Sequence, residues 1–124
     1  MPAPSRGEVW DLNLDPTTGH EQAGSRPVLI LSADIFNEGP ADLVVVIPLT
    51  RTERKVRWHV AIRPPEGGLV ADSFIQCESV RSVSKRRVIR LRGRVSESTL
   101  QQVEDRVRIL LGLLRAGERR LQLL

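Results

Sequence analysis

The residues near the amino terminus alternate between apolar and polar side chains, which is the period of a β-strand. The apolar members of this series are Trp10, Leu12 and Leu14, and they predict a half-buried strand. Asp15-Pro16 is expected to end it, because proline cannot donate a hydrogen bond to the ladder. A polar loop follows, and the apolar run 28–31 then predicts a second, buried strand.

Four further segments have the apolar content of strands, namely 43–49, 58–62, 69–76 and 88–95. Gly93 is expected to introduce a bulge into the last of them. Residues 50–57 are polar and charged without an apolar period, which indicates an exposed loop. A short helical turn is expected over 32–36 and a tight turn over 63–68, where proline and glycine cluster.

The apolar period lengthens in the last quarter of the chain, where it predicts an amphipathic helix. The residues on its apolar stripe are Leu100, Val103, Val107, Leu110, Leu111 and Leu114. Ser98 and Gln101 have the spacing of a capping box, and Gly117 is the expected stop. The whole pattern predicts a mainly β fold with a C-terminal α-helix, built as a small barrel-like sheet. We expect one domain over 1–124, with a core of about 5–114 and a tail over 115–124.

Composition and charge narrow the class of protein. The chain has 124 residues, of which 40% are hydrophobic and 27% charged, as in ordinary globular proteins. Its net charge of +4 and the predominance of arginine among its bases favour a polyanionic partner. The single cysteine, Cys77, rules out an intrachain disulfide and is expected to be buried. Without an apolar stretch of about 20 residues or a signal-peptide pattern, the expected location is the cytoplasm.

The residue types that build metal and cofactor sites are scarce. One cysteine and two distant histidines form no ligand cluster, and no phosphate-binding glycine loop occurs. A Ser/His/Asp triad remains open, although no nucleophile-elbow motif supports it. We therefore expect a protein that works without metal or cofactor.

The segment 6–27 carries a dense motif. Its fixed positions are Arg6-Gly7-Glu8-Val9-Trp10, then Leu14-Asp15-Pro16, and then Gly19, Glu21, Gln22, Gly24, Arg26 and Pro27. This motif resembles that of the MazF/PemK family of toxin endoribonucleases. The resemblance continues through Leu49-Thr50, His59-Val60, Val80-Arg81 and Gly93-Arg94-Val95-Ser96. It implies an SH3-like small β-barrel of the MazF/PemK/CcdB type, assembled as a homodimer.

The same resemblance implies that Arg26 and Thr50 are the catalytic residues. The family cuts RNA without metal through attack of the 2′-hydroxyl, which gives a cyclic phosphate and a 5′-hydroxyl. A guanidinium stays protonated at neutral pH, so Arg26 is expected to act as an electrostatic clamp and general acid. Two structural alternatives stay open: Arg26 pairs with Glu21, or Thr50 makes a strand-end hydrogen bond.

Substrate contacts are expected from polar and basic residues in the loops. They are Thr17, His20, Glu21, Gln22, Arg51, Trp58, Glu78, Arg81 and Lys85. Trp58 is the best candidate for base stacking, whereas Trp10 is expected in the core. His59 is expected to pack or hydrogen-bond rather than to catalyse. A solvated strand edge is the usual explanation of the basic run 81–94, and it is favoured more for Arg90 to Arg94 than for Arg81 and Lys85.

The expected partners are single-stranded RNA and an acidic MazE-like antitoxin that covers the RNA groove. Two rival functions remain: a CcdB-like toxin that poisons DNA gyrase, or a non-catalytic RNA-binding module. Two segments depart from the family pattern. Arg57-Trp58 replaces Pro-Thr, and Glu78-Ser79-Val80-Arg81 replaces Asp/Glu-Gln-apolar-Arg. Because both flank the family's groove, the recognised base sequence stays undetermined.

Overall fold

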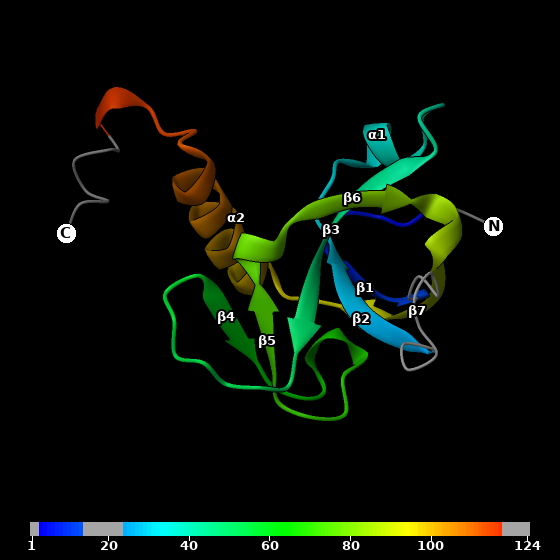
Figure 1. The fold of residues 1–124 in the computed structure, drawn as a ribbon, viewed down its shortest axis with the longest axis horizontal. Helices are drawn as coiled ribbons and strands as arrows, with labels where there is room; N and C mark the ends of the chain where they lie inside the picture. The colour runs from blue at the N-terminus through cyan, green and yellow to red at the C-terminus, as the bar shows by residue number, and fades with distance from the viewer. Residues whose placement is uncertain (1–2, 14–23, 118–124) are drawn as a thin grey trace.

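The computed structural model describes residues 3–13 and 24–117, and within them a mainly β fold with a C-terminal helix (Figure 1). The strands are β1 (Glu8–Asn13), β2 (Ser25–Ile30), β3 (Leu43–Thr50), β4 (His59–Ile62), β5 (Ser73–Gln76), β6 (Arg81–Ser84) and β7 (Val88–Arg94). The helices are α1 (Asp34–Asn37) and α2 (Glu97–Leu111), with short 3₁₀ turns η1 (Glu66–Gly68), η2 (Cys77–Ser79) and η3 (Lys85–Arg87).

All strand pairs are antiparallel, in the order β4-β5-β3-β2-β1-β7. Strand β3 is shared between two parts of the sheet. Its first half, from Leu43 to Val46, pairs with β6, and its last two residues, Leu49 and Thr50, pair with β5. Within the described residues the strands curve like a barrel but do not close, because β4 and β7 end the path (Figure 1).

Two hydrophobic cores lie on opposite faces of the sheet. One lies inside the curve of the strands and contains Trp10, Leu12, Val28, Ile30, Val44, Val46 and Val83. The other joins the sheet to α2 and contains Val9, Leu29, Ile47, Leu49, Val60, Ile62, Leu69, Ile75, Cys77, Val95, Val103 and Val107. The expectation of a half-buried first strand is therefore wrong. Strand β1 contributes Val9 to one core and Trp10 to the other, so both of its faces are buried.

Helix α2 begins and ends earlier than the sequence predicts. Its N-cap is Ser96, whose Oγ accepts from the backbone N–H of Thr99 at 3.1 Å, so the capping box at Ser98 and Gln101 is wrong. Gly112 ends the helix with a φ of 71°, and its N–H donates to the carbonyls of Arg108 and Ile109. A glycine adopts this left-handed conformation without strain, so the helix stops there and not at Gly117.

The predicted bulge at Gly93 is confirmed. Val9 pairs with Gly93 and Trp10 with Leu91, which leaves Arg92 as the extra residue. A Cβ at position 93 would lie 2.6 Å from the backbone nitrogen of Gly68, so a side chain would not fit there. Strand β6 was not predicted, because its sequence is polar and carries no alternating apolar pattern.

Helix α2 packs on one face of β4 and β5, through Val103 and Val107. Because neighbouring residues of a strand point to opposite faces, the alternate residues of these strands point away from α2. We call this second surface the open face, and it carries His59, Phe74 and Gln76. Thr50 of β3 joins it through its pairing with Phe74, and Arg26 of β2 joins it through its hydrogen bond to Gln76. None of the helices in residues 3–13 and 24–117 is long and apolar enough to cross a bilayer.

Candidate functional site

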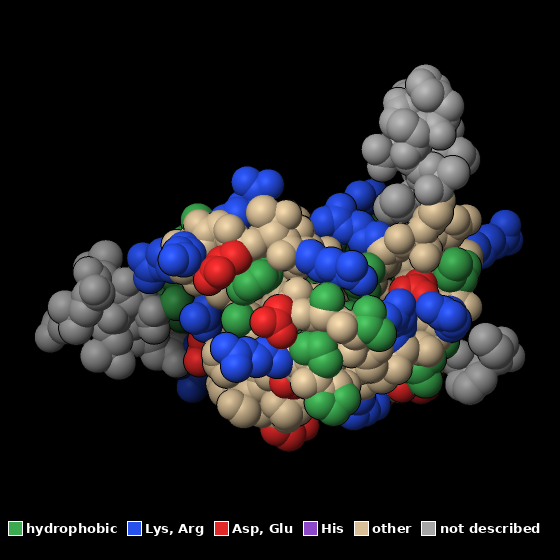
Figure 2. All heavy atoms as spheres, turned by 90° about the horizontal axis from the view of Figure 1, so that it is seen from below, with side chains coloured by type: hydrophobic (Ala, Val, Ile, Leu, Met, Phe, Trp, Pro, Cys, Tyr) green, Lys and Arg blue, Asp and Glu red, His purple; other side chains and the backbone are tan. Residues whose placement is uncertain are grey.

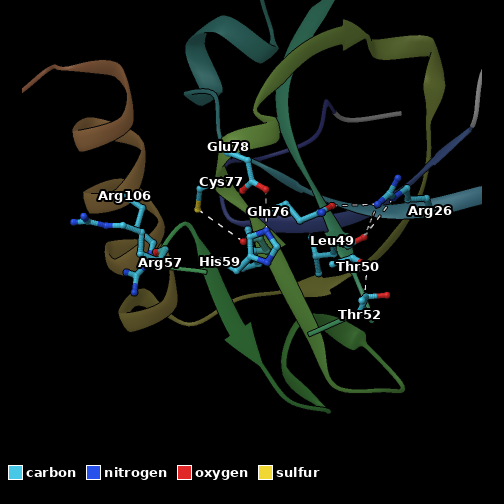
Figure 3. Close-up of polar contacts among 11 residues, drawn as sticks. Arg26, Leu49, Thr50, Thr52, Arg57, His59, Gln76, Cys77, Glu78 and Arg106 are labelled. Atoms are coloured by element: carbon cyan, nitrogen blue, oxygen red, sulfur yellow. Dashed lines mark hydrogen bonds and ion pairs between the residues drawn. The ribbon is translucent and has the colours of Figure 1, made fainter. Parts of the chain in front are cut away.

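Arg26 is the central side chain of the open face. It lies in β2, half-buried, and its Nε and Nη2 both donate to the main-chain oxygen of Leu49 at 3.3 Å (Figure 3). Nη2 also donates to Oε1 of Gln76 at 3.2 Å. Three hydrogen bonds thus fix the plane of the guanidinium across β3 and β5, while Nη1 takes no part in them. A guanidinium held in this way is prepared to bind an anion with its remaining donors.

Thr50 directly follows the residue that holds Arg26. The main-chain oxygen of Leu49 accepts both hydrogen bonds from Arg26, and Thr50 itself pairs with Phe74 of β5, the strand that also carries Gln76. The ladder between β2 and β3 ends at Val28 and Pro48, two residues short of Arg26 and Thr50. The Thr50 hydroxyl oxygen accepts from the N–H of Thr52 at 3.1 Å, which leaves the hydroxyl proton to be donated to another acceptor.

Gln76, which the sequence did not single out, connects this pair to a second one. Strands β4 and β5 place His59 opposite Gln76. The His59 Nε2 lies 2.9 Å from Oε2 of Glu78 (Figure 3), and the His59 side chain is only 4% exposed. His59 therefore packs and hydrogen-bonds, as predicted. The sequence feature that could have identified Gln76 is its position two residues after Phe74, at the polar end of a strand, which places both side chains on one face.

Several residues predicted for the site lie elsewhere or cannot be placed. Thr17, His20, Glu21 and Gln22 lie outside the described residues, and so does the alternative pairing of Arg26 with Glu21. Arg51 is exposed directly after Thr50. It lines a cavity of about 210 Å³ with Thr50, Ser73, Arg90 and Arg92.

Trp58 is not brought together with Arg26 and Thr50. It lies half-buried against α2, where it lines a cavity with Asp105, Arg106 and Ile109. The guanidinium of Arg57 lies 5.1 Å from the centre of its ring, and Arg106 donates to the Arg57 main-chain oxygen at 2.9 Å. Trp58 directly precedes His59, so the alternation of the strand turns it to the face opposite the site. Figure 3 shows Arg57 and Arg106 beside α2, apart from Arg26.

The basic residues after η2 also lie away from Arg26 and Thr50. Arg81 pairs with Val46 of β3, four residues from Thr50, or roughly 13 Å along the strand. Lys85 lies beyond the start of β3 and donates through Nζ to the Asn37 main-chain oxygen at 2.6 Å, so it holds α1 in place. It lies at the level of Asp42, eight residues before Thr50, or roughly 26 Å along the strand at ~3.3 Å per residue.

Acidic partners neutralise part of the basic run. Arg90 and Arg92 both pair with Asp11, at 2.8 and 3.3 Å, and Arg94 approaches Glu8 at 3.6 Å. Figure 2 shows Lys and Arg side chains spread around one face of the molecule, with acidic and hydrophobic side chains among them. Arg26 is therefore distinguished from the other basic residues by the hydrogen bonds that hold it, and not by a patch of positive charge.

Cys77 has no role in this site. It is fully buried, and that burial raises the pKa of its thiol to about 11. The predicted structural role is confirmed. In the described part of the chain, no three His, Cys, Asp or Glu side chains converge on a point that could hold a metal ion.

Comparisons with known proteins show the family of the chain. Residues 5–111 match the family model described as the PemK-like, MazF-like toxin of type II toxin–antitoxin systems. The chain is 34% identical over 113 residues to Endoribonuclease MazF9 of Mycobacterium tuberculosis, covering 87% of this chain and 96% of that protein. It is 32% identical over 110 residues to Endoribonuclease EndoA of Bacillus subtilis, covering 88% and 95%.

Solved structures show the same fold. A MazE–MazF complex of Deinococcus radiodurans superposes with a TM-score of 0.79 at 28% identity, covering 90% of this chain and 98% of that one. A mycobacterial endoribonuclease in complex with its cognate antitoxin gives a TM-score of 0.75 at 26% identity, covering 91% and 99%. The predicted fold class is confirmed by these likenesses.

Proposed function

Because the chain belongs to the PemK-like, MazF-like toxins of type II toxin–antitoxin systems, we propose that it is an endoribonuclease that cuts single-stranded RNA at specific sequences without a metal ion. The observation that carries this proposal is the guanidinium of Arg26, fixed by Gln76 and by the main-chain oxygen of Leu49, the residue before Thr50. The proposal takes Arg26 and Thr50 of the open face as its two catalytic residues.

The proposed reaction uses a nucleophile that RNA itself provides. The 2′-oxygen bonds to phosphorus while the bond from phosphorus to the 5′-oxygen breaks. The 2′-hydroxyl gives its proton to water and the 5′-oxygen gains one from the Arg26 guanidinium, which water then reprotonates, so that the products are a 2′,3′-cyclic phosphate and a 5′-hydroxyl. The protein has to orient the strand, stabilise the charge that grows on the phosphoryl oxygens and assist the two proton transfers.

Arg26 and Thr50 supply these functions in the proposal. The Arg26 donors that do not bind Leu49 or Gln76 stabilise the phosphoryl oxygens, and the guanidinium can give a proton to the leaving 5′-oxygen. The Thr50 hydroxyl donates to a phosphoryl oxygen. Both side chains project from paired strands, which hold a functional group more accurately than a loop does.

The proposed assembly is a homodimer that acts in the cytoplasm and is inhibited by an acidic, MazE-like antitoxin. One structural neighbour is an endoribonuclease in complex with its cognate antitoxin and another is a MazE–MazF complex, which supports an antitoxin partner for this chain. The net charge of +4 suits both an acidic protein and RNA. Like the one-domain organisation with a tail over 115–124, the dimer is a prediction.

Incubating the purified protein with a long RNA in EDTA tests the function. Discrete fragments that end in a cyclic phosphate support the proposal, and the Arg26→Ala variant should produce almost none. Retardation of the RNA without cutting would instead indicate an RNA-binding module. Inertness toward RNA combined with inhibition of gyrase would indicate a gyrase-poisoning toxin.

A further inference from the structure

His59 and Glu78 form a polar pair whose members differ in exposure. The His59 side chain is 4% exposed and that of Glu78 is 37% exposed, although their Nε2 and Oε2 atoms are 2.9 Å apart. A ligand on the open face can therefore reach the carboxylate but not the imidazole. The buried ring acts on anything outside the protein only through the carboxylate that it holds.

The hydrogen bond determines which atom of His59 carries a proton. An ionised carboxylate only accepts hydrogen bonds, so Nε2 must be the donor. Nδ1 is buried and has no partner among the described residues. Fixed by this bond, the carboxylate of Glu78 keeps the second lone pair of Oε2 and both lone pairs of Oε1 for a ligand.

The pair lies next to the proposed catalytic residues. His59 is directly opposite Gln76 in the β4–β5 ladder, and Gln76 accepts from Nη2 of Arg26. Glu78 follows two residues later, in η2. A strand of RNA whose phosphate contacts Arg26 would therefore bring a neighbouring nucleotide within reach of Glu78.

The negative charge of Glu78 indicates what it would contact. A carboxylate repels phosphate groups, so it is unsuited to holding the backbone of RNA. Its favourable contacts are the N–H donors on the edges of bases, which unpaired bases leave accessible. Guanine fits best, because N1–H and N2–H lie side by side on its Watson–Crick edge and match the two oxygens of a carboxylate.

We propose that Glu78 reads the Watson–Crick edge of a guanine beside the scissile phosphate, and that His59 is the positioning residue that orients its carboxylate. This inference rests on the proposed function and adds to it the identity of one recognised base. It also assigns a role to a histidine that the cleavage chemistry does not use.

The first test compares binding of two oligonucleotides that carry 2′-deoxy sugars and so cannot be cut by 2′-hydroxyl attack. One contains guanine and the other inosine, which lacks the N2 amino group. We expect the wild-type protein to bind the guanine form about 5- to 100-fold more tightly at one position only. Glu78→Gln should bind both forms equally. Equal affinity of the wild-type protein for both forms at every position would overturn the proposal.

The second test maps cleavage of an RNA of random sequence by sequencing the cut ends. Wild-type protein should enrich guanine at one position next to the cut, and Glu78→Gln should lose this enrichment while cutting continues. The matched control is Glu38→Gln, which removes one negative charge at the end of α1 and should leave the cleavage map unchanged.

Two variants of His59 separate positioning from packing. His59→Gln keeps a donor where Nε2 stands and should retain the guanine preference within about twofold, whereas His59→Leu should lose it. If both bind the inosine and guanine oligonucleotides as the wild-type protein does, His59 does not orient Glu78. Absence of cleavage by the wild-type protein would overturn the proposed function, but the inosine comparison would still decide the base contact. A protein that neither binds nor cuts would overturn both.

Discussion

Nη2 of Arg26 donates to Oε1 of Gln76 at 3.2 Å, across a sequence separation of 50 residues. The two side chains come from strands β2 and β5, which do not pair with each other but flank β3. The contact therefore depends on the order of three strands. It orients the guanidinium without neutralising it, since the amide of glutamine carries no charge.

Replacing Arg26 by alanine should abolish most of the activity. Loss of one preorganised donor to a developing charge costs roughly 3 kcal/mol, or about 100-fold in rate. Single-turnover cleavage of RNA measures the effect, and thermal unfolding should show a native-like fold. Arg26→Lys keeps the charge but loses the planar fork, so it should restore little activity. A normal cleavage rate in Arg26→Ala would remove this residue from the mechanism.

Gln76→Leu should lower kcat about tenfold while changing KM little, because it removes an acceptor that orients Arg26 and does not itself touch RNA. A hydrogen bond to a charged group contributes roughly 1.5–3 kcal/mol. Gln102→Leu, at an exposed position of α2, is the matched control and should leave kcat unchanged. If KM rose instead and kcat stayed constant, Gln76 would be a binding residue.

Thr50→Val removes one hydroxyl and keeps the shape of the side chain. We expect a loss of about 100-fold in cleavage rate if the hydroxyl donates to a phosphoryl oxygen. Thr50→Ser should remain active. The valine variant also leaves the N–H of Thr52 without its acceptor, but this group is exposed and water can replace the partner. Denaturant unfolding should therefore show a change in stability below about 1 kcal/mol.

The strands other than β6, and helix α2, could be predicted from the sequence because apolar periodicity reports which side chains are buried. Periodicity does not report which strands pair, so Gln76 could not be connected to Arg26. The proximity of Arg26 and Thr50 came from the family resemblance alone. Trp58 was assigned to the site because it follows the loop after Thr50, although the alternation that begins at His59 turns it toward α2.

Asp11→Ala should destabilise the fold. The Asp11 carboxylate is 4% exposed and accepts from two arginines, of which Arg92 is largely buried. Removing the carboxylate leaves Arg92 without its acidic partner, which should cost about 2 kcal/mol, less than a fully buried pair because Arg90 is exposed. Urea denaturation measures the change. Asp11→Asn keeps one acceptor oxygen, so its free energy of unfolding should fall by less. An equal fall in the two variants would show that the charge of Asp11, and not its hydrogen bonding, stabilises the fold.

Cys77 should make stability fall at alkaline pH. Burial raises its thiol pKa from 9.0 to about 11, so the unfolded chain releases this proton at a lower pH than the folded protein does. The contribution of the buried thiol to the free energy of unfolding is fully present below pH 9 and is lost progressively as the pH rises toward about 11. Unfolding free energies measured across this range for the wild-type protein and Cys77→Val should diverge. Parallel curves would show that the thiol does not titrate differently on unfolding.

The oxygen that receives two of the Arg26 hydrogen bonds belongs to the peptide backbone at Leu49. No substitution at that codon can delete it, so mutation has little access to this half of the support. The other half, at Gln76, is a side chain and is open to change. Mutations in descendants of this gene can therefore change the orientation of the Arg26 guanidinium through position 76. The hydrogen bonds to the Leu49 main chain persist for as long as the fold does.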